Sequence, residues 1–266
     1  MDEVFSKTRV LILVMTYPHP SRGYQELVCT AGITENLEWV RLYPVDYRYR
    51  PKNQRFQKYQ WVNINLASRG KGNDNRKESR KPDLESIRLI GEPLSSKNNW
   101  LERRLIVEKL PIHTIHELRR LYDSDKTSLG IIRPKRIIDL VIEEDDEVWK
   151  PQWQELYSQL TLFGPTPKPL AKIPYKFSYI FECDDDEKSH QAMIEDWELG
   201  VLYLKEAARL GNKEKAAESV RKKYFDDICA TDKDTHFFMG TTFPYNSWVV
   251  LGTYYPKKEY QLTLGF

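Results

Sequence analysis

The sequence predicts an α+β protein in which a small N-terminal β-barrel-like sheet module is followed by a mixed helix-and-strand C-terminal part. Short β-forming runs dominate the first third of the chain, whereas capped helical segments appear only later. β-Forming runs then return near the end, so strands and helices are segregated rather than strictly alternating. We expect a β-rich module over residues 1–95 and an α+β domain over residues 96–266.

The N-terminal module is predicted from runs rich in Val, Ile, Leu, Thr and aromatic residues, which favour strands. Pro, Gly and Asn separate these runs, which span residues 9–16, 26–33, 38–43 and 60–67. Residues 68–83 form a polar tract, which predicts a long loop that is either functional or disordered. Residues 86–90 are then expected to return to the sheet.

The first helical signals are two capping-box patterns, in which a capping side chain precedes a Glu by three positions. Asn99 precedes Glu102 in this way, and Thr114 precedes Glu117. The second pattern predicts a helix through about residue 122. Further helices are expected at residues 153–163, 189–210 and 213–227, and strands at residues 136–143, 177–183, 236–242 and 247–255.

Positive charge is concentrated in one segment, although the whole chain has a formal net charge of only +2. Between residues 41 and 81 the cations are Arg41, Arg48, Arg50, Lys52, Arg55, Lys58, Arg69, Lys71, Arg76, Lys77, Arg80 and Lys81. The aromatic residues between them are Tyr43, Tyr47, Tyr49, Phe56, Tyr59 and Trp61. Cations that hold phosphates and rings that stack on bases suit a nucleic acid, so the segment predicts a nucleic-acid-binding surface.

If residues 47–50 are extended, Tyr47 and Tyr49 share one face and the arginines between them share the other. The preceding loop, stiffened by Pro18 and Pro20, adds a further cation and ring. The predicted nucleic-acid-binding residues are Arg22, Tyr24, Tyr47, Arg48, Tyr49, Arg50, Arg55 and Lys58. The expected ligand is RNA or DNA, including modified or single-stranded forms. In the structural alternative the rings fill the β core while Arg and Lys side chains pass alongside them.

An acidic cluster beside a histidine supports a second hypothesis, a metal-dependent nuclease or phosphodiesterase. The candidate catalytic residues are Asp186, His190 and Glu198, and the candidate metal ligands are Asp184 and His190. In the structural alternative the acids offset a helix dipole and His190 is a hydrogen-bonded core residue. A third hypothesis is a protein-interaction module whose aromatic residues form a hot spot.

The cysteines and the lengths of the apolar stretches indicate the compartment and the partners. The three cysteines are widely spaced and never form a Cys-x-x-Cys pair, which favours a reducing compartment and predicts a cytoplasmic protein. No stretch approaches the roughly 20 apolar residues that cross a bilayer, so we expect no membrane partner. No pattern predicts a cofactor.

Several blocks of the chain are similar to a bacterial family of uncharacterised proteins. The blocks are Thr16-Tyr17-Pro18, residues 26–32, residues 39–45, residues 58–62, Asp196-Trp197-Glu198, residues 236–240 and residues 248–252. The N-terminal β segment also resembles the small barrels of PUA and ASCH-type domains. That resemblance implies recognition of RNA or of a modified base in a cleft lined by loops.

Overall fold

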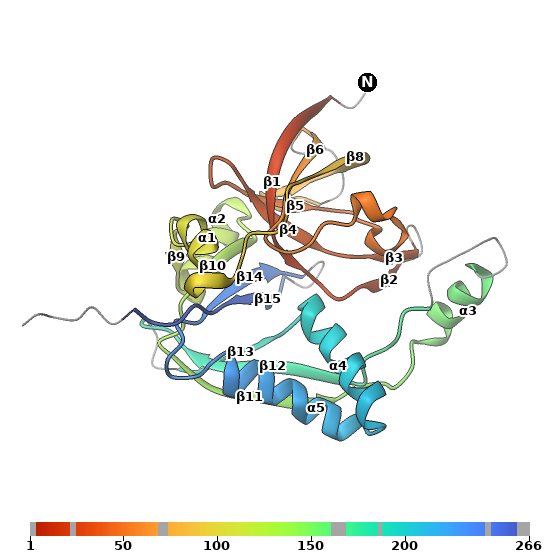
Figure 1. Cartoon of the computed structure of the whole chain (residues 1–266), viewed down its shortest axis with the longest axis vertical. Helices are drawn as coiled ribbons and strands as arrows, with labels where there is room; N and C mark the ends of the chain where they lie inside the picture. The colour runs from red at the N-terminus through yellow and green to blue at the C-terminus, as the bar shows by residue number, and fades with distance from the viewer. Residues whose placement is uncertain are drawn as a thin grey trace, which may run out of the picture.

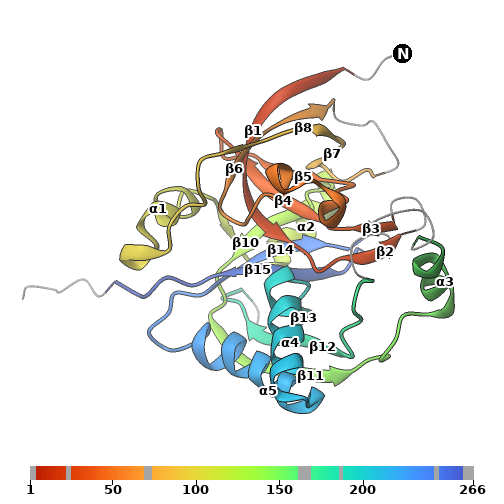
Figure 2. The ribbon, with the colours of Figure 1, turned by 45° about the vertical axis from the view of Figure 1, so that its right-hand side comes forward.

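The computed structural model describes residues 4–21, 25–68, 74–160, 169–185, 188–242 and 246–259. Helices and strands are both abundant, and the strands form several sheets, which confirms the α+β class. Figures 1 and 2 show the N-terminal strands at the top, a second sheet in the middle, and a third sheet with two helices below.

The N-terminal sheet has six strands in the order β7-β5-β4-β1-β6-β8. Their bounds are β1 (Phe5–Met15), β4 (Thr30–Thr34), β5 (Trp39–Leu42), β6 (Trp61–Ala67), β7 (Ser79–Arg80) and β8 (Pro82–Ile90). The central strand β1 pairs antiparallel with β4 and β6. The two edge strands, β7 and β8, follow each other along the chain and are joined through Lys81. The sheet therefore curls toward itself, although hydrogen bonds between described residues do not close it into a barrel.

Three short elements lie beside this sheet. The hairpin of β2 (His19–Ser21) and β3 (Gln25–Leu27) follows β1. Two 3₁₀ turns, η1 (Tyr47–Tyr49) and η2 (Lys52–Gln54), occupy the middle of the basic segment. The extended form considered for residues 47–50 does not occur, because the chain turns tightly there before Pro51.

The continuous apolar run of β1 is explained by burial on both faces of the sheet. Val10, Ile12 and Met15 pack into a core inside the N-terminal module. Leu11 and Leu13 face the other way, into a second core shared with the middle sheet. The N-terminal module is thus joined to the rest of the protein through its own central strand.

The C-terminal part contains two further sheets. The middle sheet has the order β15-β14-β10-β9, and the lower sheet has the order β11-β12-β13. The strands are β9 (Ile112–His113), β10 (Leu129–Ile132), β11 (Arg136–Glu144), β12 (Tyr175–Glu182), β13 (His190–Met193), β14 (His236–Thr241) and β15 (Trp248–Tyr254). Strand β15 contacts both β1 and β13, so the middle sheet connects the upper and lower layers.

Helices cover the outside of these sheets. They are α1 (Lys97–Val107), α2 (Ile115–Asp125), α3 (Pro151–Leu160), α4 (Trp197–Leu210) and α5 (Lys213–Arg221), with a π-helical turn η3 (Lys222–Asp227) after α5. The predicted Thr114 capping box at the start of α2 is confirmed. Among the described residues, no helix combines the length and apolar character needed to span a membrane.

The helix predicted over residues 189–210 is wrong in its first third. Residues His190–Met193 form strand β13, which pairs antiparallel with β12, and their burial alternates as in a strand. Helix α4 begins only after Asp196, whose side chain accepts a hydrogen bond from the backbone N–H of Glu198. A capping aspartate favours a helix start at that position over one seven residues earlier.

Helix α4 lies very close to the loop that follows β1. A Cβ atom added to Gly200 would lie 2.2 Å from Cδ2 of Tyr17. We expect Gly200→Ala to lower the free energy of unfolding by about 2 kcal/mol. An overpacking cost of about 3 kcal/mol should outweigh the gain of about 1 kcal/mol from helix propensity. Urea denaturation measures this change.

Val201→Ala is the matched control, because Val201 is exposed on the same helix. We expect its effect to stay within about 0.5 kcal/mol. A Gly200→Ala protein that is as stable as the original protein would contradict the close approach of α4 to Tyr17.

Candidate functional site

The predicted binding residues Arg48 and Tyr49 lie beside a buried carboxylate rather than on an open surface. The Nη1 atom of Arg48 donates to both carboxylate oxygens of Glu26, at 2.9 and 3.1 Å. The Glu26 side chain is only 3% exposed. Burial raises the pKa of Glu26, and the neighbouring Arg48 guanidinium opposes that rise. Tyr49 is half-buried nearby, and burial raises the pKa of its hydroxyl, with Glu26 adding to the effect.

Arg50 and Arg55 also make contacts within the module. Arg50 donates to Glu85 Oε1 at 2.5 Å and to Asp46 Oδ2 at 2.7 Å. Arg55 is exposed, and its guanidinium donates to the backbone carbonyls of Arg50 and Arg48 at 2.7 and 2.9 Å. These bonds hold the two 3₁₀ turns together.

Lys58 reaches across to helix α4. Its Nζ atom lies 2.5 Å from Asp196 Oδ1 and 3.1 Å from Glu198 Oε2. The Lys58 and Asp196 side chains are 9% and 1% exposed, so this ion pair is almost fully removed from water. Burial alone would lower the pKa of Lys58, but the two carboxylates raise it above its ordinary value. Lys58 therefore remains charged and joins the N-terminal module to the C-terminal part.

Two more cations of the basic segment are buried at the same junction. Arg41 donates through Nη2 to the backbone carbonyl of Ser128, at 3.0 Å, and through Nη1 to the Cys29 sulfur, at 2.9 Å. Arg76 donates to the backbone carbonyl of Thr241 at 2.8 Å. Both arginines thus attach the N-terminal sheet to the middle sheet, one next to β10 and the other at β14.

The two predicted stacking rings that the structure describes, Tyr47 and Tyr49, are both half-buried. Tyr47 packs against Phe56 and against Trp197 of α4, with ring centroids 5.2 and 5.3 Å apart. Its hydroxyl donates to the Phe56 carbonyl at 2.6 Å, so this ring is part of the packing. The predicted contacts Arg22 and Tyr24 lie outside the described residues.

The candidate metal and catalytic residues lie in different surroundings. Asp184 is on an exposed turn, His190 is buried in β13, and Glu198 is paired with Lys58. Asp186 lies outside the described residues. Within the described ranges, no group of three or more His, Cys, Asp or Glu side chains is arranged to hold a metal ion.

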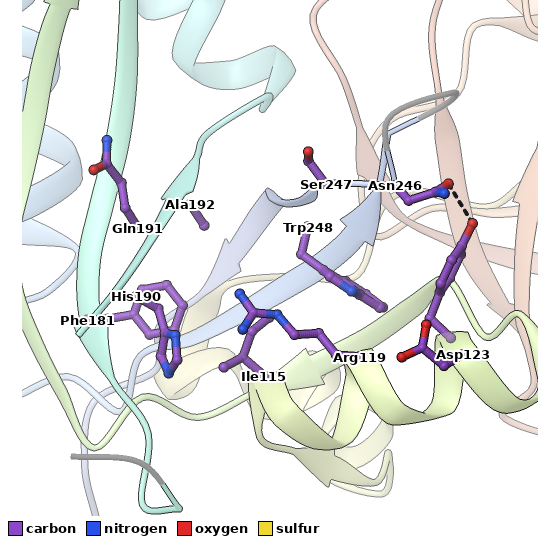
Figure 3. Close-up of a pocket in the computed structure, with 11 residues that line it drawn as sticks. Ile115, Arg119, Asp123, Phe181, His190, Gln191, Ala192, Asn246, Ser247 and Trp248 are labelled. Carbon is purple, nitrogen blue, oxygen red and sulfur yellow. Dashed lines mark hydrogen bonds between the residues drawn. The ribbon is translucent and has the colours of Figure 1, made fainter. Parts of the chain in front are cut away.

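A polar pocket of about 520 Å³ opens between α2, β13 and the start of β15 (Figure 3). Its lining residues are Ile115, Arg119, Tyr122, Asp123, Phe181, His190, Gln191, Ala192, Asn246, Ser247 and Trp248. We call it the α2–β15 pocket. The four lining positions on α2, at 115, 119, 122 and 123, share one helical face because of the helix period. The volume is within the range typical of small-molecule sites.

Arg119 and Asp123 are the charged side chains of the α2–β15 pocket. They are one helical turn apart on α2, a spacing at which opposite charges often pair. Here neither side chain has an ion-pair or hydrogen-bond partner among the described residues. Figure 3 shows the Arg119 guanidinium directed toward the strand that carries His190 and Gln191, while Asp123 lies on α2 below the Trp248 indole and apart from Asn246. Both charges are therefore available to a ligand.

Aromatic and amide groups complete the pocket. Trp248, the first residue of β15, is half-buried and turns its indole toward Arg119. Asn246 Oδ1 accepts a hydrogen bond of 2.5 Å from the Tyr122 hydroxyl, which leaves its Nδ2 as a donor. His190 lies at the other end, with its ring 5.4 Å from that of His116 and 5.7 Å from that of Phe181.

Of the residues singled out in the sequence, only His190 lines this pocket. The helical spacing of Arg119 and Asp123 was visible in the sequence, but it did not reveal which face of α2 would line a pocket. Trp248 and Asn246 are far away along the chain, and only the pairing of β14 with β15 positions them. Sequence patterns without a fold could not bring these three segments together.

Two family matches divide the chain. Residues 111–265 match the family described as Domain of unknown function (DUF8757), and residues 6–109 match Domain of unknown function (DUF8758). The first match covers more than half of the chain. The chain belongs to the DUF8757 family. This confirms the resemblance to a family of uncharacterised proteins, while the similarity to PUA and ASCH-type barrels stays a prediction.

The α2–β15 pocket lies entirely within the DUF8757 part of the chain. A search of curated proteins finds no match. Among solved structures, the chain is similar to a murine DNA-binding protein bound to double-stranded DNA. The identity is 11%, the TM-score is 0.31, and the alignment covers 97% of this chain and 99% of that one. A TM-score this low does not establish a shared fold.

The Arg48–Glu26 pair predicts a pH-dependent loss of stability. Arg48→Ala leaves the Glu26 carboxylate buried without its cation, which should cost about 2 kcal/mol at pH 7. The folded-state pKa of Glu26 is already raised, and loss of Arg48 raises it further. An acid with a raised folded-state pKa stabilises the folded state as the pH falls. We therefore expect the difference in free energy of unfolding between Arg48→Ala and the original protein to become smaller as the pH is lowered from 7 to 5, measured by urea denaturation.

Lys52→Ala is the control, because Lys52 is an exposed cation of the same segment. Its stability should stay within about 0.5 kcal/mol of the original protein at both pH values. A deficit in Arg48→Ala that is constant with pH would contradict the role given to Glu26.

Proposed function

We propose that the protein binds RNA or DNA and takes up one unstacked nucleotide in the α2–β15 pocket. The observation that carries this proposal is the Arg119 guanidinium, which has no partner among the described residues and lies beside the Trp248 indole. A guanidinium binds phosphate oxygens through two parallel N–H donors. An indole offers a base a flat surface on which to stack.

The two ends of the pocket suit different parts of a nucleotide. In Figure 3 the Arg119 guanidinium lies on the β13 side of the Trp248 indole and suits a phosphate, while Trp248 and Asn246 lie toward the start of β15 and suit a base. A stacked base contributes about 1–3 kcal/mol. Readout of this kind requires a base outside a duplex, as in single strands, loops or flipped nucleotides.

The N-terminal module is proposed to add phosphate contacts that are independent of sequence. Arg55 and Lys52 are exposed there and can approach a backbone. Arg48, Arg50 and Lys58 are held in ion pairs, so we expect their substitution to act on stability first.

Arg119→Ala tests the pocket directly. We expect affinity for a fluorescently labelled single-stranded oligonucleotide to fall about tenfold, because one charge-assisted phosphate contact is lost. The slope of log affinity against log salt should flatten by about 0.7, the contribution of one phosphate on a single strand. Fluorescence anisotropy at several salt concentrations measures both quantities.

Arg120→Ala is a matched control. Arg120 is the next residue on α2, is exposed and carries the same charge, but does not line the pocket. It should leave affinity within about twofold of the original protein. Equal losses in the two variants would show that net charge alone matters and would overturn the pocket proposal.

A further inference from the structure

The chain that follows β15 is attached to helix α1, and both ribbon views show it passing beside that helix (Figures 1 and 2). The ring of Tyr255 packs against that of Trp100, with centroids 4.7 Å apart. The Asn99 side chain binds both backbone groups of Lys257. Its Nδ2 donates to the Lys257 carbonyl at 3.0 Å, and its Oδ1 accepts from the Lys257 N–H at 2.6 Å. The start of α1 therefore sets the path of this segment.

The backbone of α1 is strained where it makes these contacts. Asn99 and Trp100 have φ angles of 51° and 62°, in the left-handed region. For residues other than glycine this conformation costs free energy, and it persists only where the surrounding contacts hold it. The contacts of Asn99 and Trp100 with residues 255 and 257 are of this kind. The first turn of α1 is thus fitted to the chain that leaves β15.

Arg104 extends the attachment to Glu259, where the described part of the chain ends. Its guanidinium forms an ion pair with Glu259 Oε1. Leu105, the next residue of α1, is 59% exposed, and Leu101, one turn earlier, is 50% exposed. Residues four apart lie on the same face of a helix. We call this face, with its two exposed leucines, the Leu101–Leu105 strip. It begins beside the point that Glu259 reaches.

The seven residues after Glu259 have the pattern of a half-buried strand. Residues 260–266 are Tyr-Gln-Leu-Thr-Leu-Gly-Phe, with an apolar side chain at every second position and no charge. They lie outside the described residues. An extended chain advances about 3.3 Å per residue, so Leu262 can lie up to about 10 Å beyond Glu259, which is far enough to reach Leu105.

We propose that residues 260–266 dock on the Leu101–Leu105 strip of the same chain, with their alternate apolar side chains against α1. Burial of apolar surface drives this contact. The occupant is the chain's own segment because Asn99 and Arg104 already hold the preceding residues against α1. That attachment gives the segment a millimolar effective concentration, which a separate partner would have to match. The described residues that line the α2–β15 pocket include none from α1, so this inference is independent of the proposed function.

The test is limited digestion of the full chain with chymotrypsin, with mass spectrometry to follow the cut after Tyr260. A docked segment is cut only from its open form, so the rate of cutting reports how often the segment opens. We expect the double substitution Leu101→Asp and Leu105→Asp to speed this cut at least about tenfold, because a carboxylate is costly to bury against apolar side chains. The cut site itself is unchanged in this variant.

Two further variants sharpen the test. Val201→Asp is the matched control, because Val201 is an exposed apolar residue on a different helix, α4. Its cutting rate should stay within about twofold of that of the original protein. Arg104→Ala removes the ion pair with Glu259 without adding a charge to the strip, and it tests the attachment even if the double variant is unstable. It should speed the cut about threefold, the value of one partly exposed ion pair.

Three results would overturn the inference. Equal rates of cutting after Tyr260 in the original protein and in the double variant would show that the segment does not dock on the strip. An unchanged rate in Arg104→Ala would show that the ion pair does not hold the segment on α1. A cut that slows as the concentration of the original protein rises would show that a second copy covers the strip instead.

Discussion

The fold depends on positive charge buried at the junction between the N-terminal module and the rest of the chain. Lys58 pairs with Asp196 at the start of α4, Arg41 binds the Ser128 carbonyl beside β10, and Arg76 binds the Thr241 carbonyl at the end of β14. Taking an ion out of water costs several kcal/mol, and only a well-placed partner offsets that cost. Each of these cations therefore fixes the position of a segment that is distant in sequence. The apolar core around Leu11 and Leu13 attracts the N-terminal module to the middle sheet without fixing their orientation. The buried cations fix that orientation.

This arrangement explains why the segment richest in cations is not the most accessible binding surface. Most of its guanidinium and ammonium groups already have acceptors within the fold, and Tyr47 is packed against α4. The charged groups that lack partners among the described residues of the α2–β15 pocket are Arg119 and Asp123, in a part of the sequence with no excess of charge. A ligand site is better identified by charge that remains unpaired after folding than by charge density along the chain.

Local patterns in the sequence predicted much of the secondary structure. The Thr114 capping box and the strand at residues 136–143 were visible because both depend on neighbouring residues. The predicted helix wrongly included His190 because buried and exposed residues alternate over only four positions before Asp196. Four positions are too few to distinguish a strand from a helix. The pocket was beyond prediction, since Arg119, Gln191 and Trp248 meet only through the packing of α2, β13 and β15. The ion pairs of Lys58 and Arg48 were hidden for the same reason, because their partners are set by tertiary contacts.

Equilibrium urea unfolding of the full chain, with and without Lys58→Met, tests most directly whether buried charge joins the two halves. We expect one cooperative transition in the original protein, with the tryptophan-fluorescence and far-ultraviolet circular-dichroism curves coinciding. In Lys58→Met that whole transition should move to lower urea by about 3–5 kcal/mol, because Asp196 is left buried without its cation. Two separate transitions in the original protein, or a substitution that destabilises only one of them, would show that buried charge does not join the two halves.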